Sequence, residues 1–262
     1  MTTEYPSTSL TDDATHLLPT LRAGCAAIDV ALDPNQVRRL HDYMVLLLGQ
    51  RGQVNLTGIR DLAQAERLLL LESIAAAIAL PILRAPPCGT VALRLLDVGT
   101  GGGIPGIPLA IAFPHLSVTL IEATRKKVDF LGHAVRSLGL KNVEALWGRA
   151  EEQGHVAAHR EQYDVVTVRG VGGLATVTEL ALPFCALGGT LLVYKSLPLD
   201  SEIQAAMHAI NVLGGSLPRV TPFNLPELPQ QHCAVTLSKT AGTPQQYPRR
   251  DGLPARRPLA ES

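Results

Sequence analysis

A run of glycines that follows an acid is the part of the sequence best suited to bind a small ligand. It reads Asp97-Val98-Gly99-Thr100-Gly101-Gly102-Gly103-Ile104-Pro105-Gly106. Glycine adopts backbone angles that other residues avoid and lets a ligand approach the main chain without meeting a Cβ atom. Glu122 stands near the end of the next expected strand, where a carboxylate can accept hydrogen bonds from both hydroxyls of a ribose. The loop and this acid together indicate a nucleoside-binding site.

The glycines fit two different ligand-binding motifs. The G-x-G-x-x-G spacing of dinucleotide-binding proteins is met by Gly101, Gly103 and Gly106. The acid-x-G-x-G-x-G spacing of class I S-adenosylmethionine enzymes is met by Asp97, Gly99, Gly101 and Gly103. We favour the second motif, because the expected strand ends at Val98 and Gly99 is then the first residue of the turn. A carboxylate also repels a pyrophosphate and attracts the ammonium and sulfonium groups of S-adenosylmethionine. Cofactor contacts are therefore expected at Asp97, Gly99, Thr100, Gly101 and Gly103.

The elements that must position this loop follow an alternating pattern. From Val91 onward, short β-rich runs alternate with helical stretches, which is typical of βαβ units and a parallel sheet. Strands are expected at residues 93–98, 117–123, 143–147, 164–169, 190–195 and 233–238. Helices are expected at residues 105–113, 126–138, 174–186 and 200–213. The sequence predicts an α/β fold with a doubly wound, mostly parallel, Rossmann-like sheet whose ligand lies beyond the carboxyl ends of the strands.

The chain divides into four expected segments. Residues 14–84 have a helical pattern and are predicted to form an N-terminal helical extension packed on the core, and residues 85–239 are predicted to form the Rossmann-like domain. Residues 1–13 and 240–262 are predicted to be disordered tails, because they are rich in polar residues or in proline.

Two helices are expected within the N-terminal extension. Asp33, Pro34 and Gln36 supply a capping side chain, a proline at the first helical position and an amide three residues after the cap, which together mark a helix start. A second helix is expected over residues 61–80, and its mostly apolar surface predicts that it is buried.

Composition excludes several classes of protein. The 262 residues are 46% hydrophobic and 18% charged, so a sizeable core can form and global disorder is excluded. Lys and Arg together number 23, as do Asp and Glu, so any binding to nucleic acid must use a local patch. Only 4% of the residues are aromatic, which argues against binding single strands mainly by base stacking. The longest apolar stretch is broken by Glu72 and Pro81, and no membrane span is expected.

The cysteines and histidines do not predict a metal site. Four cysteines are scattered without a C-x-x-C motif: Cys25, Cys88, Cys185 and Cys233. This pattern is typical of buried thiols in a reducing cytoplasm, and the first residues do not resemble a secretory leader. His155 and His159 are four residues apart but lack a third ligand. We therefore expect a cytoplasmic protein that binds neither a metal nor a membrane.

The glycine segment continues in a more specific pattern. After Asp97-Val98-Gly99-Thr100-Gly101-Gly102-Gly103 the chain reads Ile104-Pro105-Gly106-Ile107-Pro108-Leu109-Ala110-Ile111. This stretch resembles the signature of the bacterial small-subunit ribosomal RNA guanine-N7 methyltransferases, once called glucose-inhibited division protein B. Further similar pieces occur in order: Asn55-Leu56-Thr57 with Arg60-Asp61, Lys126-Lys127 with Phe130-Leu131, Arg149-Ala150-Glu151, and Arg169. The resemblance covers about residues 21–239.

The resemblance implies a cofactor, a substrate and a set of contacts. The cofactor would be S-adenosyl-L-methionine, and the acceptor would be N7 of a guanine in the 530 loop of 16S ribosomal RNA, as naked RNA or in the small ribosomal subunit. The implied cofactor contacts are Gly99, Ile104, Ala150, Glu151 and Arg169, with Glu122 on the ribose and Ala150 and Glu151 beside the adenine. Substrate contacts are expected at Asn55, Thr57, Lys126 and Lys195. We expect the enzyme to be a monomer.

The sequence departs from the family pattern at three places. Gln50-Arg51-Gly52 stands where Trp-Asn-Lys is usual, and Leu69 stands where a His usually precedes the acid-Ser pair, here Glu72-Ser73. Gly170 follows Arg169 where alanine is commoner. Two of the three changes lie in the helical part expected to meet RNA, and all three leave the cofactor motifs intact.

Methylation of guanine N7 needs no general base, because N7 has an unshared electron pair and carries no proton. Holding N7 in line with the methyl carbon at ~3–3.5 Å and excluding water then supply most of the catalysis. Arg169, at the end of the fourth expected strand, is the predicted catalytic residue. It is expected to hold a phosphate, the cofactor or guanine O6 alone, since bidentate pairing with O6 and N7 would occupy the nucleophile. A surface ion pair with Asp164 is the structural alternative.

Two other functions stay open at this point. A nicotinamide dehydrogenase would use the shifted glycine spacing, but it would need a substrate domain that this chain is too short to supply. A relative that has lost catalysis would bind the cofactor and act as an interaction module. For Lys126 and Lys195, a solvated position without a role in RNA binding is the competing interpretation.

Overall fold

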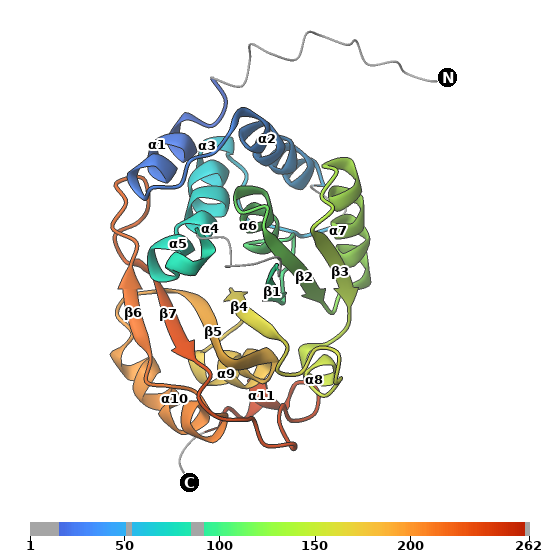
Figure 1. Ribbon diagram of the computed structural model, residues 1–262, viewed down its shortest axis with the longest axis vertical. Helices are drawn as coiled ribbons and strands as arrows, with labels where there is room; N and C mark the ends of the chain where they lie inside the picture. Colours follow the sequence, from blue (N-terminus) through green and yellow to red (C-terminus); the bar gives the residue numbers. More distant parts are fainter. Residues whose placement is uncertain (1–15, 51–53, 85–91, 260–262) are drawn as a thin grey trace.

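A single sheet runs through the middle of the protein, for which the computed structural model describes residues 16–50, 54–84 and 92–259 (Figure 1). Its seven strands are β1 (Leu93–Val98), β2 (Leu116–Glu122), β3 (Val143–Trp147), β4 (Tyr163–Arg169), β5 (Cys185–Ser196), β6 (Arg219–Pro222) and β7 (His232–Ser238), in the order β3-β2-β1-β4-β5-β7-β6. Strands β1 to β5 are parallel, and β7 is antiparallel to both β5 and β6. The predicted doubly wound, mostly parallel α/β fold is confirmed. The predicted tail 1–13, Cys88 and the boundary at residue 85 lie outside the described residues.

Helices cover both faces of the sheet. Helices α6 (Gly106–Ala112) and α7 (Arg125–Ser137) lie on one face, and α9 (Leu174–Ala181) and α10 (Asp200–Val212) lie on the other. Two short helices, α8 (Ala150–Gln153) and α11 (Leu253–Arg256), lie near α9. Among the described residues, no helix is long and apolar enough to cross a membrane.

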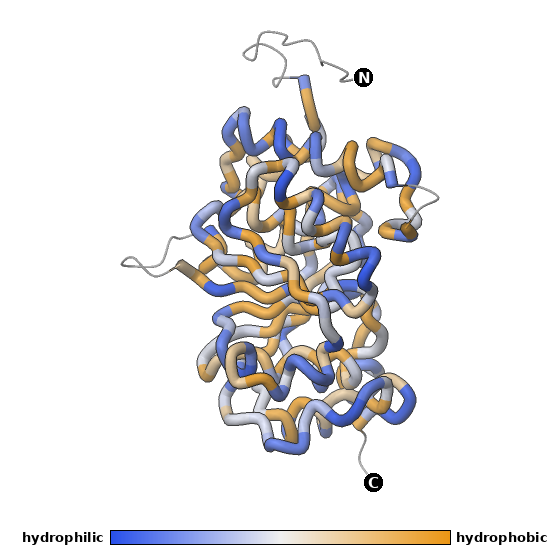
Figure 2. The backbone as a smooth tube through the Cα atoms, turned by 90° about the vertical axis from the view of Figure 1, so that its right-hand side faces the viewer, coloured by the Kyte–Doolittle hydropathy of each residue, from blue (hydrophilic) through white to orange (hydrophobic). Residues whose placement is uncertain are grey.

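The core is divided between the two faces of the sheet. Because successive side chains of a strand point to opposite faces, Leu95 joins the cluster under α6 and α7, while Leu96 joins the cluster under α9 and α10. Figure 2 shows hydrophobic colour along the stacked central strands. A strand buried on both faces reads as a nearly continuous apolar run, which is why the sequence pattern located β1 at its observed bounds. The bounds of β3, which is only partly buried, also agree with the prediction.

Some helices and strands on the β5 side of the sheet differ from the bounds predicted from the sequence. The helix predicted over 174–186 ends at Ala181 and continues as a 3-10 turn, Leu182–Phe184, because Pro183 cannot donate a helical hydrogen bond. Strand β5 therefore begins at Cys185 rather than at residue 190. Strand β6 was not predicted, since its four residues at the sheet edge carry a weak pattern and end in a proline.

The N-terminal helices pack on the α6 side of the sheet. They are α1 (Pro19–Ala27), α2 (Pro34–Gly49), α3 (Leu62–Ala65), α4 (Glu72–Ile74) and α5 (Ala76–Ala79), with a π-helical segment, Glu66–Leu71, and a 3-10 turn, Pro81–Leu83. The predicted cap of α2 is confirmed: Asp33 Oδ1 accepts from Gln36 N, and Gln36 Oε1 accepts from Asp33 N, both at 2.8 Å. The helix predicted over 61–80 is observed as a nearly continuous helical run from Leu62 to Ala79, in which the wider π turn, Glu66–Leu71, interrupts the α-helical geometry. Glu66 and Glu72, at the two ends of this turn, are buried acids that each bond another part of the chain.

Residues 240–259, here named the C-terminal strap, pack across α8 and α9. The predicted disorder is therefore wrong for this segment. Arg249 binds the buried carboxylate of Glu179 through its backbone N and its Nε, each at 2.8 Å, and through Nη2 at 2.6 Å. Arg160 donates to three strap carbonyls, those of Thr243, Pro244 and Tyr247. The composition of the strap suggested disorder, but prolines lose little backbone entropy on folding. In addition, Arg249 within the strap and Arg160 outside it bind the strap to the rest of the domain.

Candidate active site

The glycine loop joins β1 to α6 in a conformation that requires glycine. Gly99, Gly101 and Gly103 have φ angles of +67°, +60° and +99°, in the left-handed region that other residues rarely enter. The N–H of Gly99 donates to Ile121 O at 2.9 Å, which holds the loop against the end of β2. A Cβ atom on Gly101 would meet nothing within 4 Å, so the loop presents bare backbone to an open space there.

Asp97 lies beneath this loop, fully buried. Its Oδ2 accepts from Thr100 Oγ1 at 2.5 Å and from Gly106 N at 3.0 Å, and its Oδ1 accepts from Thr167 Oγ1 at 3.1 Å. These bonds tie together the start of the loop, its end and the neighbouring strand β4. The observed role of Asp97 is therefore to shape the loop, and direct contact with a cofactor stays a prediction.

Burial raises the pKa of Asp97 to about 6, although hydrogen bonds from Thr100, Gly106 and Thr167 oppose the rise. A folded-state pKa above the unfolded value means that the folded protein binds more protons between about pH 4 and pH 6. Stability from this group is thus highest at low pH and is lost as the pH rises through that window. We expect the unfolding free energy of the protein, relative to an Asp97→Asn variant, to fall by about 2 kcal/mol from pH 4 to pH 7. Urea unfolding across this range measures the difference, and a constant difference would contradict the assignment.

Glu122 lies beside the loop at the end of β2 and is 7% exposed. Its Oε2 accepts from the N–H of Gly101 at 3.0 Å, and its Oε1 accepts from the N–H of Thr124 at 2.8 Å. Lys127 Nζ lies 3.9 Å from Oε2. The structure thus brings together the glycine loop and the acid that the sequence selected separately, with the carboxylate fixed at the edge of the open space.

Arg169 lies at the end of β4 with one nitrogen paired and one unpaired. Its Nη2 donates to Glu72 Oε2 at 2.9 Å, and its guanidinium carbon lies 5.7 Å from the ring centre of Tyr194. Its Nη1 is buried and has no hydrogen-bond partner among the described residues. His232 Nδ1 lies 3.1 Å from the other oxygen of Glu72. The alternative interpretation, a surface ion pair with Asp164, is not observed, since Asp164 Oδ2 accepts from the backbone N of Arg94.

Glu72 was missed as a site residue in the sequence. The available signal was an acid inside the longest apolar stretch of the chain, which implies a buried partner. The partner could not be identified, because Arg169 is 97 residues away along the chain.

The N-terminal extension contacts the glycine loop directly. Tyr43 Oη donates to Gly102 O at 2.8 Å, and a Cβ atom on Gly102 would lie 2.6 Å from Leu47 and 3.3 Å from Leu56. Leu56 stands between Asn55, which is exposed, and Thr57, whose Oγ1 accepts from Ile59 N. Two of the expected substrate residues are therefore placed next to the expected cofactor loop.

The two lysines expected to bind substrate differ in their surroundings. Lys126 is exposed in the first turn of α7. Lys195 Nζ donates to Gly172 O at 2.8 Å and to Glu202 Oε1 at 2.5 Å, so its ammonium holds the loop after β4 to α10. A phosphate would have to displace these partners to reach Lys195.

Ala150 and Glu151 begin α8, directly after β3. Glu151 is 7% exposed, and its Oε1 accepts from Arg149 Nη2 at 3.0 Å and from Gly252 N at 2.9 Å. Burial alone would raise the pKa of Glu151, but these bonds and one from its own backbone N–H bring the pKa below its usual value. Ile104 is half-buried at the end of the glycine loop.

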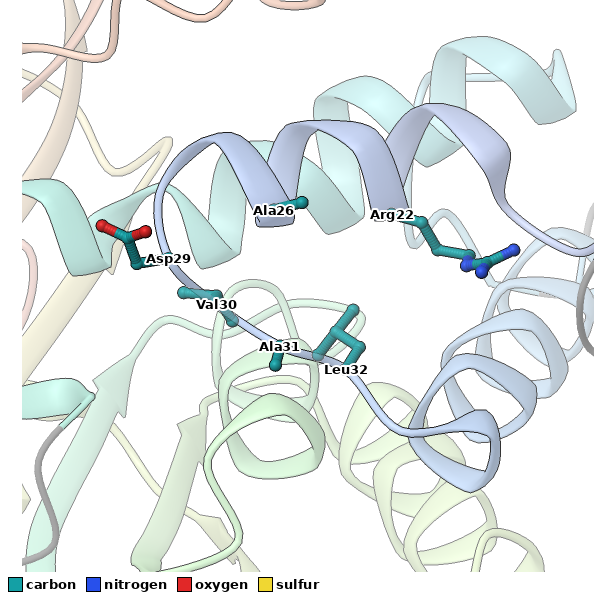
Figure 3. Close-up of a pocket in the computed structure, with 6 residues that line it drawn as sticks. All are labelled: Arg22, Ala26, Asp29, Val30, Ala31 and Leu32. Carbon is teal, nitrogen blue, oxygen red and sulfur yellow. The ribbon is translucent and has the colours of Figure 1, made fainter.

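Two pockets of about 470 Å³ each lie in different places. One opens at the ends of β2 and β3 and is lined by Ala123, Trp147, Gly148, Arg149, Glu152 and Gln153. The other lies between α1 and the segment before α2 and is lined by Arg22, Ala26, Asp29, Val30, Ala31 and Leu32 (Figure 3). Of these two, only the first borders the strand end at Glu122 and the beginning of α8, so the pocket in Figure 3 is not part of the candidate active site.

This strand order, with a glycine loop after the first strand and an acid ending the second, defines a class I S-adenosylmethionine-dependent methyltransferase. A model of the GidB family, described as rRNA small subunit methyltransferase G, matches residues 36–232. The chain belongs to this family, and the resemblance found in the sequence is confirmed.

Relatives of the same name cover most of the chain. The ribosomal RNA small subunit methyltransferase G of Moorella thermoacetica is 40% identical over 230 residues, which is 88% of this chain and 93% of the relative. That of Pelotomaculum thermopropionicum is 37% identical over 243 residues, 93% of this chain and 99% of the relative. A solved S-adenosylmethionine-dependent methyltransferase from Aquifex aeolicus is 19% identical, with a TM-score of 0.45, and the match covers 68% of this chain and 92% of that one.

Proposed function

We propose that this chain transfers a methyl group from S-adenosylmethionine to N7 of a guanine in the 530 loop of 16S ribosomal RNA. The observation that carries the proposal is the convergence of three features at the carboxyl edge of the sheet. These are the bare backbone at Gly101, the carboxylate of Glu122 and the unpaired nitrogen of Arg169. The family to which the chain belongs, and the names of its relatives, support the ribosomal RNA substrate.

The residues present fit S-adenosylmethionine. Buried polar atoms normally have hydrogen-bond partners, and the orphaned Nη1 of Arg169 suits the carboxylate of the methionine part. Glu122 suits the ribose hydroxyls, which would replace the N–H of Gly101 on Oε2. Ala150 and Glu151 then lie on the adenine side, since β3 is the neighbour of β2. Gly99 and Ile104 flank the loop that would face the ligand.

The chain's own residues contribute mainly by positioning. When bound, the cofactor supplies an electrophilic methyl group on a sulfonium. Arg169 is fixed by Glu72 and the Tyr194 ring, so its free nitrogen points in one direction without further ordering. Tyr43 and Leu56 hold the N-terminal extension on the glycine loop, which keeps water from that side. No residue has to remove a proton from guanine N7, and none is assigned to do so.

RNA would approach along the same edge. We assign Asn55 and Thr57 to substrate contact because their segment lies on the glycine loop. Exposed Lys126 is available for phosphate contact, since RNA affinity derives largely from such contacts. Lys195 is retained as a weaker contact that would first have to leave Glu202.

The direct test of this proposal is the mapping of N7-methylguanine in 16S ribosomal RNA from cells with and without the protein. We expect one such modification, within the 530 loop, to be missing in cells that lack the protein. The purified protein with S-adenosylmethionine should then restore it on undermethylated small subunits. An unchanged map would contradict the proposal, and so would loss of a modification at another site.

We also propose that the protein works in the cytoplasm, where ribosomal subunits mature, and that it works as a monomer. Light scattering coupled to size-exclusion chromatography tests the second statement, and a dimeric mass would contradict it.

A further inference from the structure

Residues of the C-terminal strap and Arg149 form a network of polar contacts with Glu151. Arg149 Nη2 and the N–H of Gly252 both donate to Glu151 Oε1, at 3.0 and 2.9 Å. Arg149 Nε lies 2.7 Å from Asp251 Oδ2. Since Asp251 and Gly252 are consecutive, the same turn of the strap fixes both the carboxylate and the arginine that binds it. The strap lies beyond residue 232, where the family match ends.

The turn is held in place from both sides. On one side Arg249 makes three hydrogen bonds to Glu179, whose side chain has no exposed surface. On the other side Thr176 Oγ1 donates to Pro254 O at 3.1 Å. Both anchors come from α9, so residues 249–254 are attached to a rigid element rather than to a loop.

Glu151 lies close to the expected ribose site. The N–H of Gly148 donates to Glu122 O at 3.1 Å, and Glu122 pairs with Trp147 in the β2–β3 register. A nucleoside whose ribose hydroxyls lie on Glu122 therefore extends its base toward the beginning of α8. This step rests on the proposed function, because it takes the ligand to be S-adenosylmethionine.

We propose that the C-terminal strap is part of the cofactor site, and that it sets the specificity for adenine by orienting the Glu151 carboxylate toward the 6-amino group of the base. An ionised carboxylate only accepts hydrogen bonds. It therefore pairs with the 6-amino group of adenine and repels the 6-oxo group of hypoxanthine. Asp251, Gly252 and Arg249 act through Glu151 and are positioning residues.

Loss of the anchor between Arg249 and Glu179 should weaken the discrimination between adenine and hypoxanthine. The probes are S-adenosylhomocysteine and its 6-oxo analogue, S-inosylhomocysteine, titrated into the full-length protein by calorimetry. We expect the wild type to bind the adenine compound more tightly, and Arg249→Ala to reduce the affinity ratio of the two compounds by about tenfold, through weaker binding of the adenine compound alone. A strap that only stabilises the fold would weaken both compounds equally, and that result would overturn the proposal.

Arg250→Ala is the matched control, because Arg250 is the exposed neighbour of Arg249. It should leave both affinities unchanged. Since Arg249→Ala leaves Glu179 buried without its partner, Asp251→Ala is the second variant. Asp251 and Arg149 are both roughly half exposed, so its loss should leave the fold intact. We expect Asp251→Ala to reduce the ratio by about threefold, and a wild-type ratio in this variant would also count against the proposal.

The two proposals fail in different ways. If the wild type bound neither compound, the proposed function itself would be wrong. If the wild type bound and discriminated, and both strap variants discriminated equally well, only the role of the strap would be wrong.

Discussion

Gly101→Val should reduce the affinity for S-adenosylmethionine at least about 100-fold. Gly101 has a φ of +60°, where a β-branched residue costs on the order of 1–3 kcal/mol. Its Cβ position has no atom within 4 Å, so the new side chain would project into the space proposed for the cofactor. It would also disturb the N–H that now binds Glu122. Isothermal titration calorimetry measures the loss, and near-normal affinity would refute the assigned site.

Gly139→Val provides a control with the same backbone strain. Gly139 has a φ of +63° and also has nothing within 4 Å of a Cβ position. It lies after α7, at the end of the sheet opposite to the strand exits. Its destabilisation should be similar to that of Gly101→Val, while its affinity for S-adenosylmethionine should stay at the wild-type value. If both variants lost affinity equally, strain rather than obstruction would be the cause.

Arg169→Ala should lower the rate of methylation by about 100- to 1,000-fold, which is the usual effect of removing one aligned donor from a catalytic site. The variant loses the Nη1 donor proposed for the cofactor and leaves Glu72 buried beside His232 alone. Removal of one partner of a buried pair costs roughly 3–5 kcal/mol, so thermal unfolding must be recorded together with single-turnover kinetics.

Arg169→Lys separates these two effects. A lysine retains a positive charge for Glu72, but one ammonium cannot replace two guanidinium nitrogens that point in different directions. We expect a melting temperature close to that of the wild type and a methylation rate reduced by about 10- to 100-fold. A wild-type rate in Arg169→Ala at a temperature where it is folded would contradict the catalytic assignment.

The parts of the fold that local sequence determines were predicted well. The cap of α2 depends only on Asp33, Pro34 and Gln36, and the bounds of β1 depend on one apolar run. The glycine loop was predicted because each positive φ requires glycine at one position. Glu122 was placed correctly beside it, since parallel strands end at the same edge of a sheet.

The parts that depend on distant contacts were not predicted. The strap is ordered by Arg249 on Glu179, a pair 70 residues apart. Its composition alone predicts disorder. The buried position of Asp97 beneath the loop depends on Thr167, which is also 70 residues away, so its motif did not reveal which way the carboxylate points. Arg169 was correctly predicted to end a strand, but neither its partner Glu72 nor its unpaired nitrogen could be predicted from the sequence.

A crystal structure of the protein with S-adenosylhomocysteine would show whether the crevice at the carboxyl ends of the strands is the cofactor site. We expect ribose hydroxyls on the carboxylate of Glu122, the amino-acid carboxylate on Nη1 of Arg169, and the adenine beside Glu151. A nucleoside bound elsewhere, or a crevice that rejects this compound and accepts a nicotinamide dinucleotide, would contradict it.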